Sequence, residues 1–109
     1  MANTYKILGQ SNPSAATLTE AYAVPAATST IVSTITVANR STVSTSFRIA
    51  IEPDGAANDN TYIAYDTPIG PNQTIVFDKL GVTIDASDTV NVYATLATLS
   101  FNIFGVEIT

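Results

Sequence analysis

The side chains that could carry out acid–base chemistry in this sequence are carboxylates and a few amines. The 109 residues include nine Asp and Glu and four Lys and Arg, but neither His nor Cys. The commonest general base and the thiolate nucleophile are therefore absent. A Ser–Lys pair would have to use Lys6 or Lys79, and no motif positions either lysine.

Two pairs of carboxylates are close in sequence, namely Asp85 with Asp88 and Glu52 with Asp54. A glycosidase needs two carboxylates that face each other across a cleft, and a chain of this length rarely forms one. We interpret these residues as turn caps and solubility charges. The sequence thus predicts a protein that is not an enzyme, with no catalytic residues and no cofactor.

The one metal that suits this chain is calcium, because oxygen atoms are the only strong ligands that it offers. The loop of residues 54–60 contains Asp54, Asn58, Asp59 and Asn60. Its spacing does not match the calcium-binding loop of an EF-hand. Asx-rich loops usually form turns, since these side chains bond their own backbone. We therefore predict no metal site.

Tyrosines offer a possible platform on which a sugar could stack. If residues 61–65 form a short strand, Tyr62 and Tyr65 fall on opposite faces of it, so only one of them can easily face solvent. Core packing with the hydroxyl at the surface is the commoner arrangement, and the absence of Trp weakens the case. A carbohydrate-binding role stays open as an alternative. The five tyrosines are Tyr5, Tyr22, Tyr62, Tyr65 and Tyr93.

The charge balance argues against several classes of partner. The formal net charge is −5, with only four basic residues, so the chain cannot form the basic patch that nucleic acid requires. Anionic membranes are disfavoured for the same reason. No apolar run approaches the roughly 20 residues of a transmembrane helix. The N-terminus has no basic segment followed by an apolar one, so we expect synthesis and folding in the cytoplasm.

Period-2 alternation of apolar residues dominates the rest of the chain and predicts β-strands. In residues 30–39, Ile31, Ile35 and Val37 share one face. In residues 46–52, Phe47 and Ile49 alternate with polar residues. We expect these two segments to pair as antiparallel neighbours in a sheet with one wet face. Further strands are expected at residues 5–9, 17–24, 61–65, 74–77, 82–84 and 89–96.

Residues 17–24 also carry a weak helical pattern, but Pro25 and the β-rich surroundings favour a strand. The last strand changes phase, because Leu99, Phe101 and Ile103 share one parity and Phe104 begins the other. This switch predicts a β-bulge beside Gly105 or a strand that is buried on both faces. The fold class is therefore all-β: a single-domain antiparallel β-sandwich or jelly roll of about seven or eight strands over residues 1–109.

The expected outer faces of these strands are rich in hydroxyls and poor in charge. Ser and Thr make up about a quarter of the chain, and charged residues only 12%. Free-standing β proteins usually protect their edges with charge, so this composition fits a protein covered by neighbours, or else a solvated Thr-rich sheet. As interface residues we select, from residues 30–39, 101–108 and 54–60, Ile31, Thr34, Thr36, Asp54, Asn58, Asp59, Phe104, Val106 and Ile108.

The sequence TEAYAVPAAT (residues 19–28), running into IVSTITVANR (residues 31–40), resembles small virion proteins of tailed bacteriophages, including phages of cyanobacteria. The likeness keeps its order over nearly the whole chain and includes residues 46–50, 62–66, 90–94 and 99–105. The chain departs from the usual pattern at residues 85–88, where a Gly before Asp88 is more common. The resemblance identifies no functional residues.

The resemblance implies a cement or decoration protein on the exterior of the phage head. Such proteins are small β-rich domains that sit as dimers or trimers over contacts between major capsid subunits. We therefore expect a location in the virion, with the major capsid protein or other virion proteins as partners. A tail, neck or baseplate component is the nearest alternative, and a carbohydrate-binding or adhesion module is the second.

Overall fold

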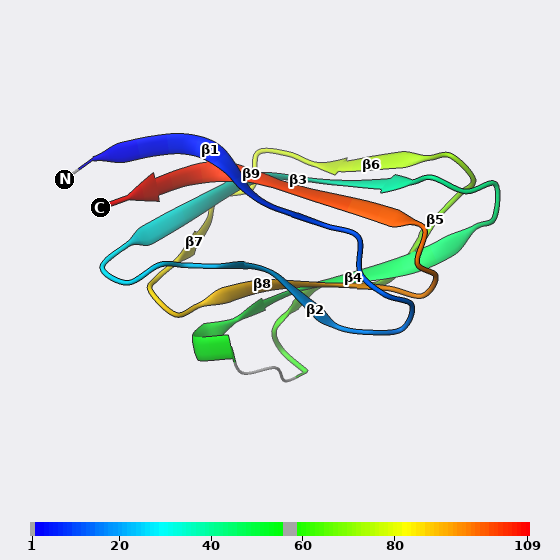
Figure 1. Cartoon of the computed structure of the whole chain (residues 1–109), viewed down its shortest axis with the longest axis horizontal. Coiled ribbons are helices and arrows are strands. Elements are labelled where there is room, and N and C mark those ends of the chain that lie inside the picture. The colour runs from blue at the N-terminus through cyan, green and yellow to red at the C-terminus, as the bar shows by residue number, and fades with distance from the viewer. Residues whose placement is uncertain (1, 56–58) are drawn as a thin grey trace.

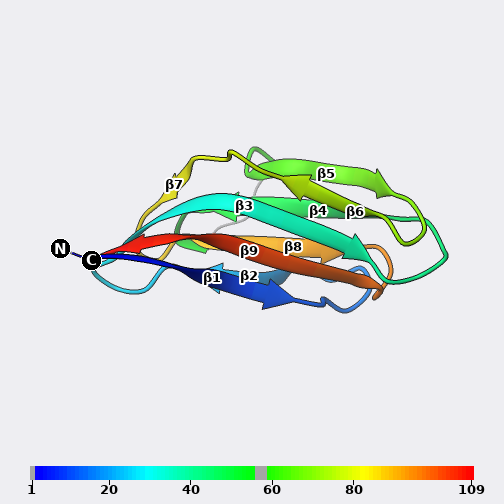
Figure 2. The same cartoon turned by 90° about the horizontal axis from the view of Figure 1, so that it is seen from above.

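The computed structural model of the chain describes residues 2–55 and 59–109. Within these residues, nine strands form two antiparallel sheets that pack face to face (Figure 1). Seen from above, the strands of both sheets run along the long axis of the molecule (Figure 2). This is the aligned packing of a β-sandwich. The all-β sandwich predicted from the sequence is confirmed, with nine strands where seven or eight were expected.

The first sheet has the order β1-β9-β3-β6, and β7 also pairs with β3. Its central strands, β9 and β3, are long enough to span the molecule, and both termini lie at the same end of it (Figure 1). The strands are β1 (Asn3–Ser11), β3 (Ser29–Asn39), β6 (Thr74–Phe77), β7 (Val82–Ile84) and β9 (Leu99–Ile108).

The second sheet has the order β2-β8-β4-β5, and a 3-10 turn, η1 (Pro53–Gly55), follows β4. The segment with the weak helical pattern forms strand β2, as predicted. Strand β5 runs past Pro68 to Ile69, which is possible because β5 is at the edge of the sheet. The strands are β2 (Thr19–Ala23), β4 (Thr45–Glu52), β5 (Tyr62–Ile69) and β8 (Thr89–Ala94).

The predicted pairing of the two most regular strands is wrong. Strand β3 belongs to the first sheet and β4 to the second, so the chain crosses between the layers at residues 40–44. Both edges of β3 are occupied by other strands, and both strands turn their apolar side to the same core. The side chain of Asn39 fixes the crossing, because its Nδ2 donates to the carbonyl oxygens of Val43 at 2.9 Å and Gly70 at 3.0 Å.

The core lies between the sheets and is built from the inward side chains of both. Phe47 of β4 contacts Phe101 of β9 and Phe77 of β6 edge to face, each with ring centroids 6.0 Å apart. Such pairs stabilise a core beyond the area that they bury. The strand expected at residues 89–96 ends at Ala94, so Leu96 lies beyond it and is 38% exposed.

Candidate functional site

The described strand residues whose side chains point to the outer side of the first sheet include no Asp, Glu, Lys or Arg. A carboxylate stands at the border of this surface, because Asp85 Oδ1 accepts a hydrogen bond from Ser29 Oγ at 3.1 Å. The register of the strands in this sheet determines which side chains point away from the second sheet, because successive residues alternate between the faces. We call this surface the neutral face. It consists of Asn3, Tyr5, Ile7, Gln10, Ser29, Ile31, Thr34, Thr36, Ala38, Thr74, Val76, Thr83, Ser100, Asn102, Phe104, Val106 and Ile108.

The structure brings six of the predicted interface residues together on the neutral face. In the register of β3 with β9, Val106 lies opposite Ile31 and Phe104 lies opposite Thr34. Two strands that are far apart in sequence therefore form one continuous surface. The six residues are Ile31, Thr34, Thr36, Phe104, Val106 and Ile108.

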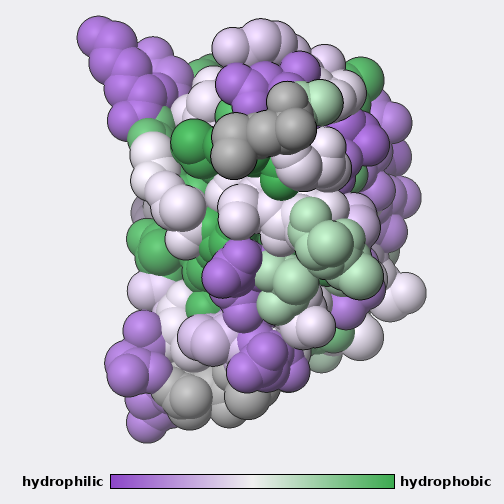
Figure 3. Space-filling view, turned by 90° about the vertical axis from the view of Figure 1, so that its left-hand side faces the viewer, coloured by the Kyte–Doolittle hydropathy of each residue, from purple (hydrophilic) through white to green (hydrophobic). Residues whose placement is uncertain are grey.

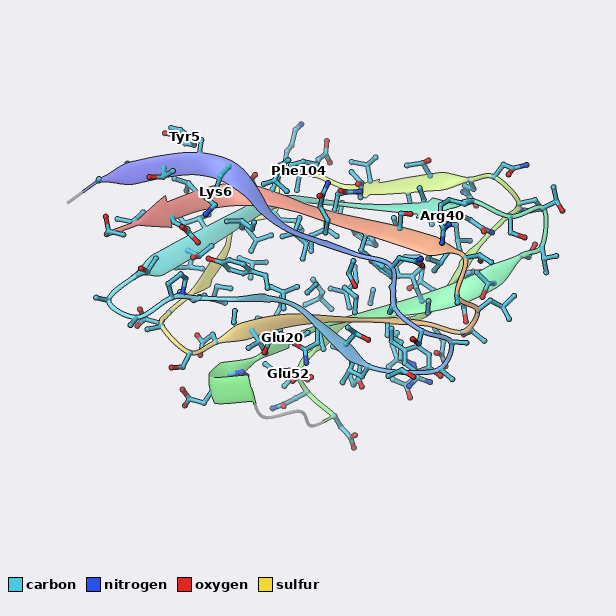
Figure 4. All side chains as sticks on the ribbon, in the orientation of Figure 1. Tyr5, Lys6, Glu20, Arg40, Glu52 and Phe104 are labelled. Carbon is cyan, nitrogen blue, oxygen red and sulfur yellow. The ribbon has the colours of Figure 1, made fainter. Side chains whose placement is uncertain are left out.

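Strand β1 adds two exposed apolar side chains that the sequence analysis did not select. Tyr5 lies opposite Val106 and is 81% exposed, and Ile7 lies opposite Phe104 and is 52% exposed. Figure 4 shows Tyr5 on the side of β1 away from the second sheet, whereas Lys6 is turned toward it. The alternation of Tyr5, Lys6 and Ile7 was a signal that could have identified them. The apolar end of the neutral face comprises Tyr5, Ile7, Ile31, Phe104, Val106 and Ile108.

Two β-bulges beside Gly105 determine which apolar residues reach this surface. Strand β3 has an extra residue, Ser33, and β1 has an extra residue, Leu8, both opposite the step from Ile103 to Gly105. An inserted residue reverses which side chains face the core. Ile31 therefore points outward, and its predicted place beside Ile35 on the inner face is wrong.

Strand β9 itself alternates without interruption. Its core-facing side chains are Leu99, Phe101 and Ile103. The apolar residues of the other parity, Phe104, Val106 and Ile108, lie half-buried on the neutral face. The irregularity predicted beside Gly105 exists, but the extra residues are in the neighbouring strands. Gly105 allows the close approach, because a Cβ atom there would collide with the carbonyl oxygen of Ile31.

The remaining predicted interface residues are away from the neutral face. Asp54 lies in η1, in the connection between β4 and β5 of the second sheet, and Asp59 is exposed in the same connection. Asn58 is outside the described residues. The carboxylate of Asp88 accepts hydrogen bonds from the backbone N–H of Asp85 at 2.9 Å and of Asp54 at 3.1 Å. Asp88 therefore caps two turns, as the sequence analysis expected of this carboxylate.

A polar cluster between the sheets supports the apolar end of the neutral face from below. The hydroxyl of Tyr22 donates to Oε2 of Glu107 at 2.7 Å and lies 2.7 Å from Oγ1 of Thr30. Lys6 Nζ lies 3.3 Å from the other oxygen of Glu107. The hydrogen bond from Tyr22 and the charge of Lys6 lower the pKa of Glu107, and burial raises the pKa of Tyr22 to about 12.

The outer side of the second sheet differs in kind, because it carries charged and aromatic side chains. The guanidinium carbon of Arg48 lies 4.1 Å from the ring centroid of Tyr65 and 4.4 Å from that of Tyr93. Arg48 Nε donates to Asp66 Oδ1 at 2.7 Å, and this hydrogen bond raises the pKa of the guanidinium. The sequence held no signal for this cluster, because its members come from three strands.

The prediction that Tyr62 and Tyr65 lie on opposite faces is wrong. Strand β5 has an extra residue opposite the step from Ile49 to Ala50, so both tyrosines reach the outer side. Their ring centroids are 4.9 Å apart, and Tyr65 is 57% exposed. Together with Asp59 they line a shallow open recess.

Glu52, expected on a wet face, is instead buried on the outer side of the second sheet. Its side chain is 2% exposed, and its Oε1 accepts a hydrogen bond from Asn91 Nδ2 at 2.8 Å. Its Oε2 has no hydrogen-bond partner among the described residues. Burial and then the charge of Glu20 raise the pKa of Glu52. Glu20 and Glu52 lie near each other below the second sheet (Figure 4).

No protein-family model matches the chain, and no curated protein sequence is significantly similar to it. Among the described residues, no group of three or more acidic side chains is placed to hold a metal ion. No helix in the described part of the chain is long and apolar enough to span a membrane. We take the neutral face as the candidate site because exposed apolar side chains lie on it beside uncharged strand residues.

The surface at the end of the sandwich that carries both termini is mixed. Figure 3 views this end and shows hydrophobic atoms in green next to hydrophilic atoms in purple, without a large area of either. The neutral face differs from this end, because its strand residues are uncharged and Tyr5 and Ile7 are exposed on it. Such a surface can bind a protein neighbour without removing water from ionised groups.

Proposed function

We propose that this protein is a structural assembly protein whose neutral face binds a neighbouring protein in a larger particle. The observation that carries the proposal is the apolar end of that face, where exposed Tyr5 and Ile7 continue into half-buried Phe104 and Val106. An apolar patch of a few hundred Å² on a protein surface is often a functional contact site. The net charge of −5 is carried by residues other than those of the neutral face, Asp85 at its border among them, and it favours solubility.

The particle that we propose is the virion of a tailed bacteriophage, with the protein as a cement or decoration protein on the head exterior. Its support is the resemblance of residues 19–40 and later segments to small virion proteins. A shell filled with DNA gains strength from weak contacts repeated over its surface, because symmetry multiplies each of them. The partners are then the major capsid protein or other virion proteins. A tail, neck or baseplate component would use the same surface.

Immunogold electron microscopy of intact virions tests this role. Antibody raised against the purified chain is expected to label heads, and removal of the protein is expected to lower the osmotic and thermal resistance of the capsid. Label confined to the tail or neck would favour the alternative position. Virions without label, with the epitope shown to be accessible, would overturn the virion role.

The involvement of the neutral face in the particle can be tested with variants in the same system. Tyr5→Lys is expected to weaken binding of the chain to particles, because a charge is introduced on the apolar end. Val43→Lys is the control, since Val43 is also an exposed apolar residue but lies in the crossing after β3. Equal binding of both variants would contradict a role for the neutral face.

One specific observation favours a carbohydrate-binding module as the second candidate. Tyr62 and Tyr65 share one side of β5 and line a recess with Asp59, so aromatic rings and a carboxylate acceptor lie together. Sugars bind such sites by stacking on rings and donating hydroxyls to acceptors.

A glycan array probed with the purified chain tests this candidate. Binding that is lost in Tyr62→Ala but kept in Tyr5→Ala would support it, because Tyr5 is on the opposite sheet. A chain that binds no glycan on the array would exclude it.

A further inference from the structure

We infer that the occupant of the neutral face is a second copy of this chain, packed sheet against sheet about a twofold axis parallel to the strands. This inference rests on the proposed assembly role: the neighbouring protein on the neutral face is the second copy, and other virion proteins then contact other surfaces of the pair. A twofold axis along the strands places the apolar end of one copy over the apolar end of the other. The hydroxyl-rich and amide-rich part then meets its own equivalent.

Charge is the first argument for a second copy. Each chain carries a formal net charge of −5, so two copies repel each other least when they meet through the neutral face, which has Asp85 at its border but no charged strand residue of its own. The outer side of the second sheet carries Glu20, Arg48 and Asp66, and lies a full sandwich thickness away. Sheets pack about 10 Å apart, which puts these charges in the two copies roughly 30 Å from each other. Salt screens such charges, because the Debye length is about 8 Å at physiological ionic strength.

The area of the neutral face is the second argument. The sheet is four strands wide, and β9 contains ten residues. With strands about 4.8 Å apart and roughly 3.3 Å per residue, the face measures roughly 600 Å². Two such faces bury roughly 1,200 Å² in total, which is the lower limit for specific, stable interfaces. A partner that covered only one strand edge would leave most of the face in water.

The polar part of the neutral face forms the opposite end of such an interface. Gln10 Nε2 donates to Asn102 Oδ1 at 2.8 Å, so these amides bond to each other within one chain. This bond uses one N–H of Gln10 and the Oδ1 of Asn102, so their other amide groups must bond to water or to the second copy. The binding energy is therefore expected to come mainly from the apolar end, while bridging water can satisfy amide groups at the polar end.

Sedimentation of the purified chain over a concentration series tests the inference. The wild type is expected to reach twice the chain mass. Val106→Lys and Tyr5→Lys are expected to raise the dimer dissociation constant at least about tenfold, although each makes the chain less negative and so weakens long-range repulsion. Val43→Lys is the matched control and is expected to dimerise as the wild type does. Tyr5 is 81% exposed, so its substitution leaves the fold intact.

Cross-linking tests the orientation, because the sequence has no Cys. A single cysteine at Ile31 or Val106, on the two central strands, is expected to cross-link two copies with a short bismaleimide, whereas Val43→Cys is not. A wild type that stays monomeric up to about 100 µM, a trimer, or equal loss of dimer in Val43→Lys would overturn the inference.

The same measurements separate this inference from the proposed function. If the chain is monomeric but the antibody labels virions, the second copy is not the partner and the assembly role is still supported. If the chain is a dimer but the antibody labels no particle, the virion role is wrong and the second copy is still supported as the partner.

Discussion

The phenolic oxygen of Tyr22 lies 2.7 Å from Oε2 of Glu107, and this hydrogen bond joins the two sheets of the sandwich. Tyr22 belongs to β2 in the second sheet and Glu107 to β9 in the first. The same hydroxyl lies 2.7 Å from Thr30 Oγ1 on β3. With its pKa raised to about 12, the phenol stays protonated at neutral pH. The pair therefore anchors the end of β9 from which Val106 and Ile108 project onto the neutral face.

Replacement of Tyr22 by Phe is expected to lower the free energy of unfolding by about 1 to 3 kcal/mol, because Glu107 and Thr30 lose a partner in a buried position. Urea unfolding followed by circular dichroism measures the change. Tyr5→Phe is the control and is expected to have no effect, since Tyr5 is exposed. Equal stability of Tyr22→Phe and the wild type would show that the bond between the sheets contributes nothing.

Glu107 is expected to make the protein sensitive to acid. Its pKa in the folded protein lies below the ordinary value of 4.5, because Tyr22 and Lys6 favour the carboxylate. The unfolded chain then binds the proton more tightly, so this stabilisation is present above pH 4.5 and is lost as the pH falls through the folded pKa. In urea unfolding, the stability difference between wild type and Glu107→Gln should shrink as the pH is lowered from 7 to 3. A constant difference would contradict this.

Glu52 is expected to act in the opposite direction. Its folded pKa is raised, so the folded protein binds the proton more tightly and loses stability as the pH rises from the ordinary carboxyl value of 4.5. Glu52→Gln keeps the acceptor for Asn91 and removes a buried charge, so it is expected to stabilise the protein at pH 7 by on the order of 1 kcal/mol. Thermal unfolding at pH 7 and pH 4 measures this gain, which should be smaller at pH 4. If Glu52→Gln were less stable than the wild type at pH 7, the ionised Glu52 carboxylate would be shown to stabilise the folded protein.

Gly105→Ala is expected to destabilise the protein by about 2 kcal/mol or more, because the new methyl group collides with the Ile31 carbonyl and must push β3 away from β9. Gly81→Ala is the matched control, since a Cβ atom there meets nothing within 4 Å. Chemical unfolding of both variants measures the difference. If Gly105→Ala also weakened the dimer, the bulge would be shown to shape the neutral face.

Periodicity predicted the strands well, because a half-buried strand must alternate apolar and polar residues wherever it lies in the fold. The alternation of Ile35 and Val37 in β3, and of Phe47 and Ile49 in β4, placed these side chains in the core, where they are found. Periodicity is a property of one strand at a time, so it contained nothing about pairing. For this reason β3 and β4 were expected to be neighbours, although they lie in different sheets.

Bulges account for the other errors. An inserted residue such as Ser33 is accommodated only because a neighbouring strand fixes the register on both sides of it. Counting residues along one strand therefore placed Ile31 inside and separated Tyr62 from Tyr65. The burial of Glu52 also depends on side chains from other strands, Asn91 of β8 among them.

The amino-acid sequence by itself determined that this protein is a single all-β sandwich without His or Cys, because local alternation and composition need no knowledge of distant contacts. It also singled out the strands that carry Ile31 and Val106. Only the tertiary structure decided that these residues join Tyr5 and Phe104 on one surface of uncharged strand residues. The physical reason is that hydrogen bonds between strands far apart in the chain set the register, and the register decides which side chains meet.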